Sequence, residues 1–67
     1  MKITVNDKQY DLNRTEMTCS ELLSNIKIDT TGLIVELDGK IYTAQQFNDA
    51  VVKDGSKLEL IRIMGGG

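Results

Sequence analysis

Apolar and polar residues alternate on either side of a turn signal within the first twelve residues. Ile3-Thr4-Val5 alternates, Asn6-Asp7 supplies turn chemistry, and the alternation resumes at Tyr10-Asp11-Leu12. A period of two is typical of a strand that buries one face, and Asn and Asp are favoured in tight turns. The pattern predicts an N-terminal β-hairpin.

A helix start signal follows the hairpin. Thr18-Cys19-Ser20-Glu21 has the T-x-x-E form of a capping box, in which the Thr hydroxyl and the Glu carboxylate satisfy free backbone N–H groups. Apolar residues then recur at helical spacing on one face, at Cys19, Leu22, Leu23 and Ile26. The sequence therefore predicts a helix from this point, with an apolar stripe that needs a sheet to cover it.

A second hairpin is predicted in the middle of the chain. Leu33–Leu37 is short, apolar and rich in β-branched residues, and we expect it at the centre of the sheet. Asp38-Gly39 is a turn signal and leads into the short extended segment Lys40-Ile41-Tyr42.

The last third of the chain is predicted to hold a single helical turn and the final strand. Thr43-Ala44-Gln45-Gln46 has the form of another capping box, and a loop is expected from Phe47 to Val52. Asp54-Gly55 then turns the chain into a strand from Lys57 to Met64.

The order strand, strand, helix, strand, short strand, strand predicts an α+β domain with a helix on one face of a mixed sheet of four to five strands. This order fits the β-grasp, or ubiquitin-like, fold. We expect one domain over residues 1–64 and a flexible glycine tail over 65–67. In such a fold the first and last strands lie parallel at the sheet centre, which would place Ile3 and Val5 near Leu58 and Leu60.

Composition excludes several classes of function. The 67 residues carry a net charge of −2, and the eight Lys and Arg are spread along the chain, so we expect neither a nucleic acid nor a membrane partner. One cysteine and no histidine exclude an internal disulfide and a Cys/His zinc site. We expect a cytoplasmic protein, since the chain shows neither a signal peptide nor a spanning segment.

The chain closes with three glycines, Gly65, Gly66 and Gly67, directly after the apolar run 58–64. No helix follows them, so they are not a phosphate-binding loop. Glycine samples backbone angles closed to other residues and can thread a narrow slot. The tail is either a frayed terminus or a terminus that is inserted into another protein and reacts there.

The chain resembles the ThiS family of bacterial sulfur carriers over its whole length. The resemblance rests on Ile3-Thr4-Val5-Asn6-Asp7, on Ser20-Glu21-Leu22-Leu23, on the stretch from Val52 to Leu60, and on the terminal glycines. The family ending is commonly Gly-Gly, so the third glycine is a departure. Either Gly67 is the reactive residue or trimming exposes Gly66, and we favour Gly67.

The resemblance implies a carrier that is not itself an enzyme and binds no cofactor. An E1-like, ThiF-like adenylating enzyme would use ATP to activate the carboxylate of Gly67. A sulfur donor such as a cysteine desulfurase would lead to a thiocarboxylate, and a ThiG-like thiazole synthase would receive the sulfur for thiamin biosynthesis. A carrier for molybdopterin or another pathway, and a non-conjugating ubiquitin-like interaction module, are the alternatives.

The last strand also predicts a docking surface. If Leu58 and Leu60 face the helix, Ile61 and Ile63 fall on the opposite side, where a bulge or a binding face would explain them. With Met64, Gly65 and Gly66 they are the expected partner-binding residues. Cys19 lies in the apolar stripe of the helix, so we expect a buried residue rather than a thiol that passes on sulfur.

Overall fold

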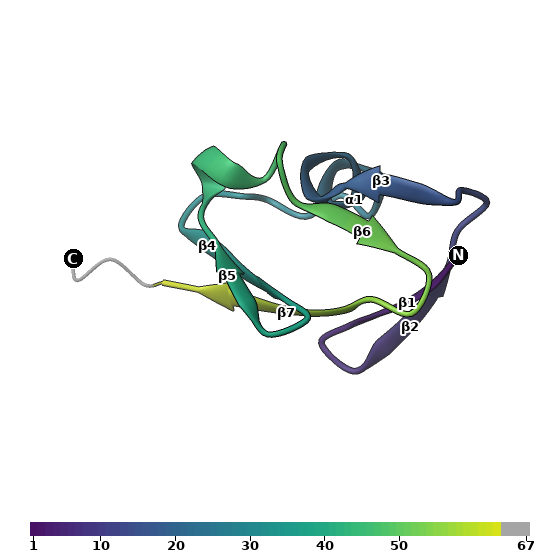
Figure 1. Ribbon diagram of the computed structural model, residues 1–67. Coiled ribbons are helices and arrows are strands. Elements are labelled where there is room, and N and C mark those ends of the chain that lie inside the picture. Colours follow the sequence, from purple (N-terminus) through teal and green to yellow (C-terminus); the bar gives the residue numbers. More distant parts are fainter. Residues whose placement is uncertain (64–67) are drawn as a thin grey trace.

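A five-stranded mixed sheet with the order β2-β1-β7-β4-β5 dominates the computed structural model, which describes residues 1–63 (Figure 1). β7 (Lys57–Arg62) occupies the centre and pairs parallel with β1 (Lys2–Val5) and antiparallel with β4 (Leu33–Leu37). The edges are β2 (Lys8–Asp11) and β5 (Lys40–Tyr42). Both predicted hairpins and the parallel pairing of the first and last strands are thus confirmed.

Two predictions about the sheet were wrong in detail. The segment Leu33–Leu37 is an interior strand but not the central one, because β7 pairs with both β1 and β4 and therefore lies between them. The last strand ends at Arg62 rather than running to Met64, which lies outside the described residues.

The turn after β1 adds two hydrogen bonds between Asn6 and β7. Asn6 and Asp7 adopt left-handed backbone angles, with φ of 48° and 67°, as a tight hairpin turn requires. The Asn6 backbone N–H donates to the Leu58 carbonyl at 2.9 Å, and its side-chain oxygen accepts the Leu60 N–H at 2.7 Å. The Asn6 side chain therefore replaces a backbone acceptor where β1 has already turned away.

The predicted capping box starts α1 (Cys19–Asn25). The Thr18 hydroxyl accepts the Glu21 N–H at 3.1 Å, and the Glu21 carboxylate accepts the Thr18 N–H at 3.1 Å. The apolar stripe faces inward, since Cys19, Leu22 and Leu23 are fully buried. These interactions confirm the predicted start of the helix and its buried face.

A second, two-stranded sheet, which the sequence pattern does not predict, lies beside α1. β3 (Glu16–Thr18) pairs antiparallel with β6 (Val51–Lys53), with Met17 opposite Val52. Figure 1 shows β3, β6 and α1 together on one side of the large sheet. The predicted loop over 47–52 is therefore wrong at its end, although the predicted helical turn is present as the 3₁₀ segment η1 (Ala44–Gln46).

The core lies between the large sheet and this second layer. Helix residues Leu22 and Leu23 and sheet residues Val35 and Leu58 have no exposed surface. Within residues 1–63, every buried side-chain nitrogen and oxygen has a hydrogen-bond partner. None of the helices in that range is long and apolar enough to cross a membrane.

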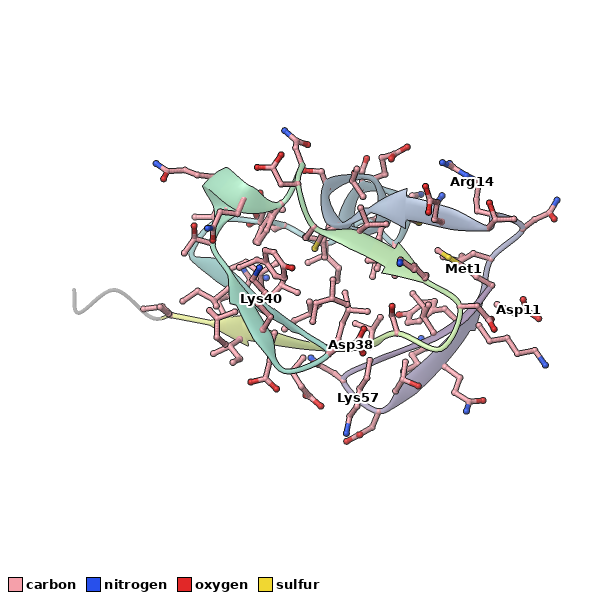
Figure 2. The ribbon with its side chains drawn as sticks, in the orientation of Figure 1. Met1, Asp11, Arg14, Asp38, Lys40 and Lys57 are labelled. Carbon is pink, nitrogen blue, oxygen red and sulfur yellow. The ribbon has the colours of Figure 1, made fainter. Side chains whose placement is uncertain are left out.

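The start of β7 is fixed at the β4–β5 turn. The Asp38 carboxylate accepts the Lys57 N–H at 2.8 Å, and the Asp38 N–H donates to the Lys57 carbonyl at 2.9 Å. Figure 2 labels both residues near this turn, and β7 runs from there toward the side of the molecule that lies away from Met1. The central strand is thus held at its beginning and leads directly to the predicted site.

Candidate functional site

The described part of the predicted site is the end of β7. Ile61 lies inside the strand and Ile63 is the last described residue, one position beyond its end. Met64, Gly65, Gly66 and Gly67 lie outside the described residues, so the predicted tail and the boundary at residue 64 stay predictions.

Alternation along β7 separates a buried face from an exposed one. Leu58 has no exposed surface and Leu60 is half-buried against the core, whereas Ile61 is 45% exposed and Ile63 is 54% exposed. The pairing with β4 runs without interruption from Leu58 to Arg62. A β-bulge would break this register, so the exposure of Ile61 belongs to a regular strand.

Two further isoleucines join them on the outer face of the sheet. Ile34 of β4 lies directly opposite Ile61, and Ile41 of β5 lies opposite Glu36, two positions along β4 from Ile34. Ile41 is 50% exposed. We call Ile34, Ile41, Ile61 and Ile63 the isoleucine patch. Ile34 is partly buried, whereas the other three are exposed, and a cluster of exposed large apolar side chains is typical of an interaction surface.

Acidic side chains border the isoleucine patch. Glu36 and Glu59 face each other across β4 and β7, on the same outer face as Ile34 and Ile61. Two like charges directly opposite each other destabilise a sheet slightly. A basic group on a docked partner would relieve this repulsion. The patch and its acidic border therefore favour a partner whose surface is apolar and flanked by positive charge.

Ile61 and Ile63 were predicted from the sequence, whereas Ile34 and Ile41 were not. The alternation in Leu33–Leu37 already indicates that Ile34 faces away from the buried leucines. That it meets Ile61 depends on the register between β4 and β7, which joins residues 27 positions apart. Alternation alone could have assigned the face, but not the neighbour.

The thiol of Cys19 is unsuited to sulfur transfer. The side chain is fully buried, and this burial raises the pKa of the thiol from 9.0 to about 11. Only the thiolate is a good nucleophile, so the group is inert near neutral pH. The predicted buried role of Cys19 is confirmed.

A groove in the rest of the described chain lies apart from the end of β7. Residues 1–63 contain no group of three or more Cys, Asp or Glu side chains that could hold a metal ion. A shallow groove of about 530 Å³ is lined by Lys2, Tyr10, Ser56 and neighbouring residues of the N-terminal hairpin. Neither Ile61 nor Ile63 contributes to it. The end of β7 thus presents exposed apolar side chains outside this groove.

Comparisons with known proteins agree with this arrangement. Residues 3–67 match the model of the ThiS family. The crystal structure of a thiamine biosynthesis protein (ThiS) from Geobacter metallireducens superposes with a TM-score of 0.87 at 35% identity, covering all of both chains. A solution structure of a thiamine biosynthesis protein from the same organism gives 0.74 at 35% identity, covering all of this chain and 88% of the other.

A longer protein also contains a matching segment. A thiazole synthase from Paramagnetospirillum magneticum is 30% identical over 67 residues, which is all of this chain and 20% of that protein. The chain thus spans about a fifth of the length of this relative.

Proposed function

This chain belongs to the ThiS family and is a ThiS-type sulfur carrier with the β-grasp fold, and from that premise we propose that its last glycine, Gly67, carries sulfur as a thiocarboxylate for thiazole formation in thiamin biosynthesis. The observation that carries the proposal is the extent of the family match. It runs from residue 3 to residue 67 and so includes the three glycines that follow β7.

The chemistry requires activation of the glycine by another protein. The pKa of a terminal carboxyl group is ordinarily about 3.5, so the group is an anion at neutral pH and a poor electrophile. One of its oxygens would attack the α-phosphorus of ATP and release pyrophosphate, giving an acyl adenylate. Hydrosulfide, the simplest sulfur donor, would then attack the carbonyl carbon, release AMP and, after loss of a proton, leave the thiocarboxylate.

The proposed division of labour assigns catalysis to partners and not to this chain. A ThiF-like adenylating enzyme would bind ATP, and a cysteine desulfurase would supply sulfur in the cell. Within residues 1–63 the only thiol is that of Cys19, which is buried and has a raised pKa, so we assign the sulfur to the terminal glycine. Because the activation consumes ATP, we place it in the cytoplasm.

The isoleucine patch is the proposed docking surface for these partners. Two of its residues, Ile61 and Ile63, lie in β7 and directly after it, on the segment that leads into the glycines, so a partner that covers them would have the terminal residues within reach. A ThiG-like thiazole synthase is the proposed sulfur acceptor. This choice is supported by the relative named thiazole synthase, in which a segment similar to this chain is part of a longer protein.

Tandem mass spectrometry of the C-terminal peptide tests the proposal. The chain would be incubated with a ThiF-like enzyme, ATP and sulfide, and we expect sulfur in place of oxygen on Gly67. Fragment ions must localise the change, because oxidation of Met64 adds nearly the same nominal mass. A reaction without ATP and a chain whose Gly67 carboxyl group is blocked are the matched controls, and both should stay unmodified.

Two other outcomes would redirect the proposal. Sulfur on Gly66 after loss of Gly67 would show that trimming precedes activation. An unmodified terminus, with an enzyme that is active on its own carrier, would oppose the carrier chemistry and favour an interaction module that uses the isoleucine patch alone.

A further inference from the structure

The end of β7 is tied to the loop between α1 and β4 by a set of hydrogen bonds that the function described so far does not use. We propose that Arg62, together with Gly32 and the backbone carbonyls of Asp29 and Thr31, forms a clasp that positions the root of the C-terminal glycines for activation. The proposal rests on the proposed carrier function and assigns Arg62 as a positioning residue for it.

The side chain of Arg62 bridges two carbonyls of one loop. One guanidinium nitrogen donates to the Thr31 carbonyl at 2.6 Å, and the other donates to the Asp29 carbonyl at 2.9 Å. Arginine presents its donors in a rigid planar fork, which a lysine cannot reproduce. The contact therefore depends on the shape of the arginine head as well as on its charge.

The loop that receives Arg62 is itself well defined. The Asp29 carboxylate accepts the Thr31 N–H at 3.0 Å, and the Thr30 carbonyl accepts the Leu33 N–H at 3.1 Å. The hydrogen bond from Thr31 is the largest cause of the lowered pKa of the Asp29 carboxyl, and the positive charge of Arg62 contributes less. Arg62 thus donates hydrogen bonds to a loop whose conformation is already fixed by its own hydrogen bonds.

Gly32 completes the clasp from the backbone side. Its carbonyl accepts the Ile63 N–H at 2.8 Å, so the residue after β7 is still held to the loop. The φ of Gly32 is +66°, and a Cβ placed on it would lie 3.0 Å from the Ile63 carbonyl oxygen. Only glycine combines this backbone angle with such a close approach.

Core packing does not account for this arrangement. Alternation places Arg62 in phase with Leu58 and Leu60, yet its side chain is exposed, and its described hydrogen bonds are those to the loop. The contacts fix the two residues directly before the stretch 64–67, which must enter the partner. The direction in which the chain leaves the domain after Ile63 is therefore set by the clasp and not by the core.

Opening the clasp should impair the presentation of Gly67 to the adenylating enzyme more than it impairs docking of the domain. The unanchored stretch that ends at the terminal carboxylate would grow from four residues, 64–67, to six residues, 62–67. Effective concentration falls roughly as the −3/2 power of length, which gives about a twofold loss. Misdirection adds to this, since reacting groups displaced by ~1 Å can lose up to about 100-fold in rate. We expect kcat for adenylation to fall about three- to tenfold.

The test compares Arg62→Ala, Arg62→Lys and Gly32→Ala, with Gly39→Ala as the matched control. Gly39 also has a positive φ, of +89°, but a Cβ there would meet nothing within 4 Å, and it lies in the β4–β5 turn. The readouts are kcat and KM of each carrier in adenylate formation by a ThiF-like enzyme, together with hydrogen exchange of the Ile63 amide.

We expect Arg62→Ala and Gly32→Ala to lower kcat with KM within about twofold of the original chain. A chain that combines Arg62→Ala with Gly32→Ala should be no worse than the worse of these two single variants, because both changes act on one clasp. Exchange of the Ile63 amide should rise at least about tenfold in Arg62→Ala. Arg62→Lys should stay close to Arg62→Ala, and Gly39→Ala should leave kcat and Ile63 exchange unchanged.

Three results would overturn the proposal. An unchanged kcat in Arg62→Ala, or unchanged exchange at Ile63, would show that the clasp holds nothing that matters for activation. Full activity of Arg62→Lys would show that the enzyme reads the charge of Arg62 and not the clasp. If the unaltered chain were not adenylated at all, the carrier function itself would fail. This outcome is distinguishable from a failure of the clasp, because it is seen without any variant.

Discussion

Ile61 offers the sharpest test of the isoleucine patch, because its side chain is only half-covered by its own domain. Complete burial of an isoleucine side chain is worth about 1.5–3 kcal/mol, and Ile61 keeps 45% of its surface exposed. A partner that covers the remainder would gain about 0.7–1.4 kcal/mol from it. Ile61→Ala should therefore raise the KM of the carrier by about three- to tenfold.

The matched control is Val51→Ala. Val51 is 42% exposed and also lies in a strand, but it belongs to β6 in the small sheet beside α1. The two variants thus remove similar exposed apolar surface from different places. Initial rates of ATP-dependent adenylate formation, measured over a range of carrier concentration, give KM and kcat for each variant.

Ile61 does not contribute to docking if Ile61→Ala leaves KM unchanged, or if Val51→Ala raises KM by the same factor. Thermal unfolding of both variants must accompany the kinetics, because Ile61 also packs across from Ile34 within the sheet. A KM effect that follows the loss of folded protein, and disappears at lower temperature, would indicate stability rather than docking.

Three further predictions concern the domain itself. Leu58→Ala should destabilise the fold by about 2–5 kcal/mol, measured by urea unfolding, against a total of roughly 3–10 kcal/mol for a chain of this length; a loss below ~1 kcal/mol would contradict its place in the core. The capping hydrogen bonds from Thr18 lower the pKa of Glu21 below 4.5, so its stabilisation is present above that pH and is lost as pH falls through the lowered folded value. The urea midpoint of Glu21→Gln should therefore change less between pH 7 and pH 3 than that of the original chain, and equal changes would oppose this. Cys19, with its pKa raised to about 11, should react with a thiol reagent at pH 8 far more slowly in the folded chain than in urea, and equal rates would show that the thiol is accessible.

Features that depend on neighbouring residues could be predicted from the sequence. The turn at Asn6-Asp7 and the capping box of Thr18 and Glu21 each satisfy backbone groups within a few positions. Their chemistry is therefore visible in a short stretch of sequence. The exposure of Ile61 followed from alternation in the same way, because successive side chains of a strand point to opposite faces.

Most features that depend on distant pairing could not be predicted; the parallel pairing of β1 with β7 is the exception, because the predicted fold implies it. β3 has three residues, of which only Met17 is buried, and it pairs with Val52, 35 positions away. Such a segment has too few alternating positions to indicate a strand. The clasp was hidden for the same reason, since nothing local shows that Arg62 meets the carbonyl of Thr31.

The position of β7 explains why one strand can serve both stability and transfer without conflict. Its period of two sends Leu58 into the core and Ile61 to the outer face, so the fold and the docking surface use different sides of the same backbone. Pairing on both edges, with β1 and β4, fixes the strand on which the patch is built. Changes at Leu58, Ile61 and Arg62 should therefore separate experimentally, into loss of folded protein, a higher KM and a lower kcat. A chain in which all three changes had the same effect would not present its terminus in the way proposed here.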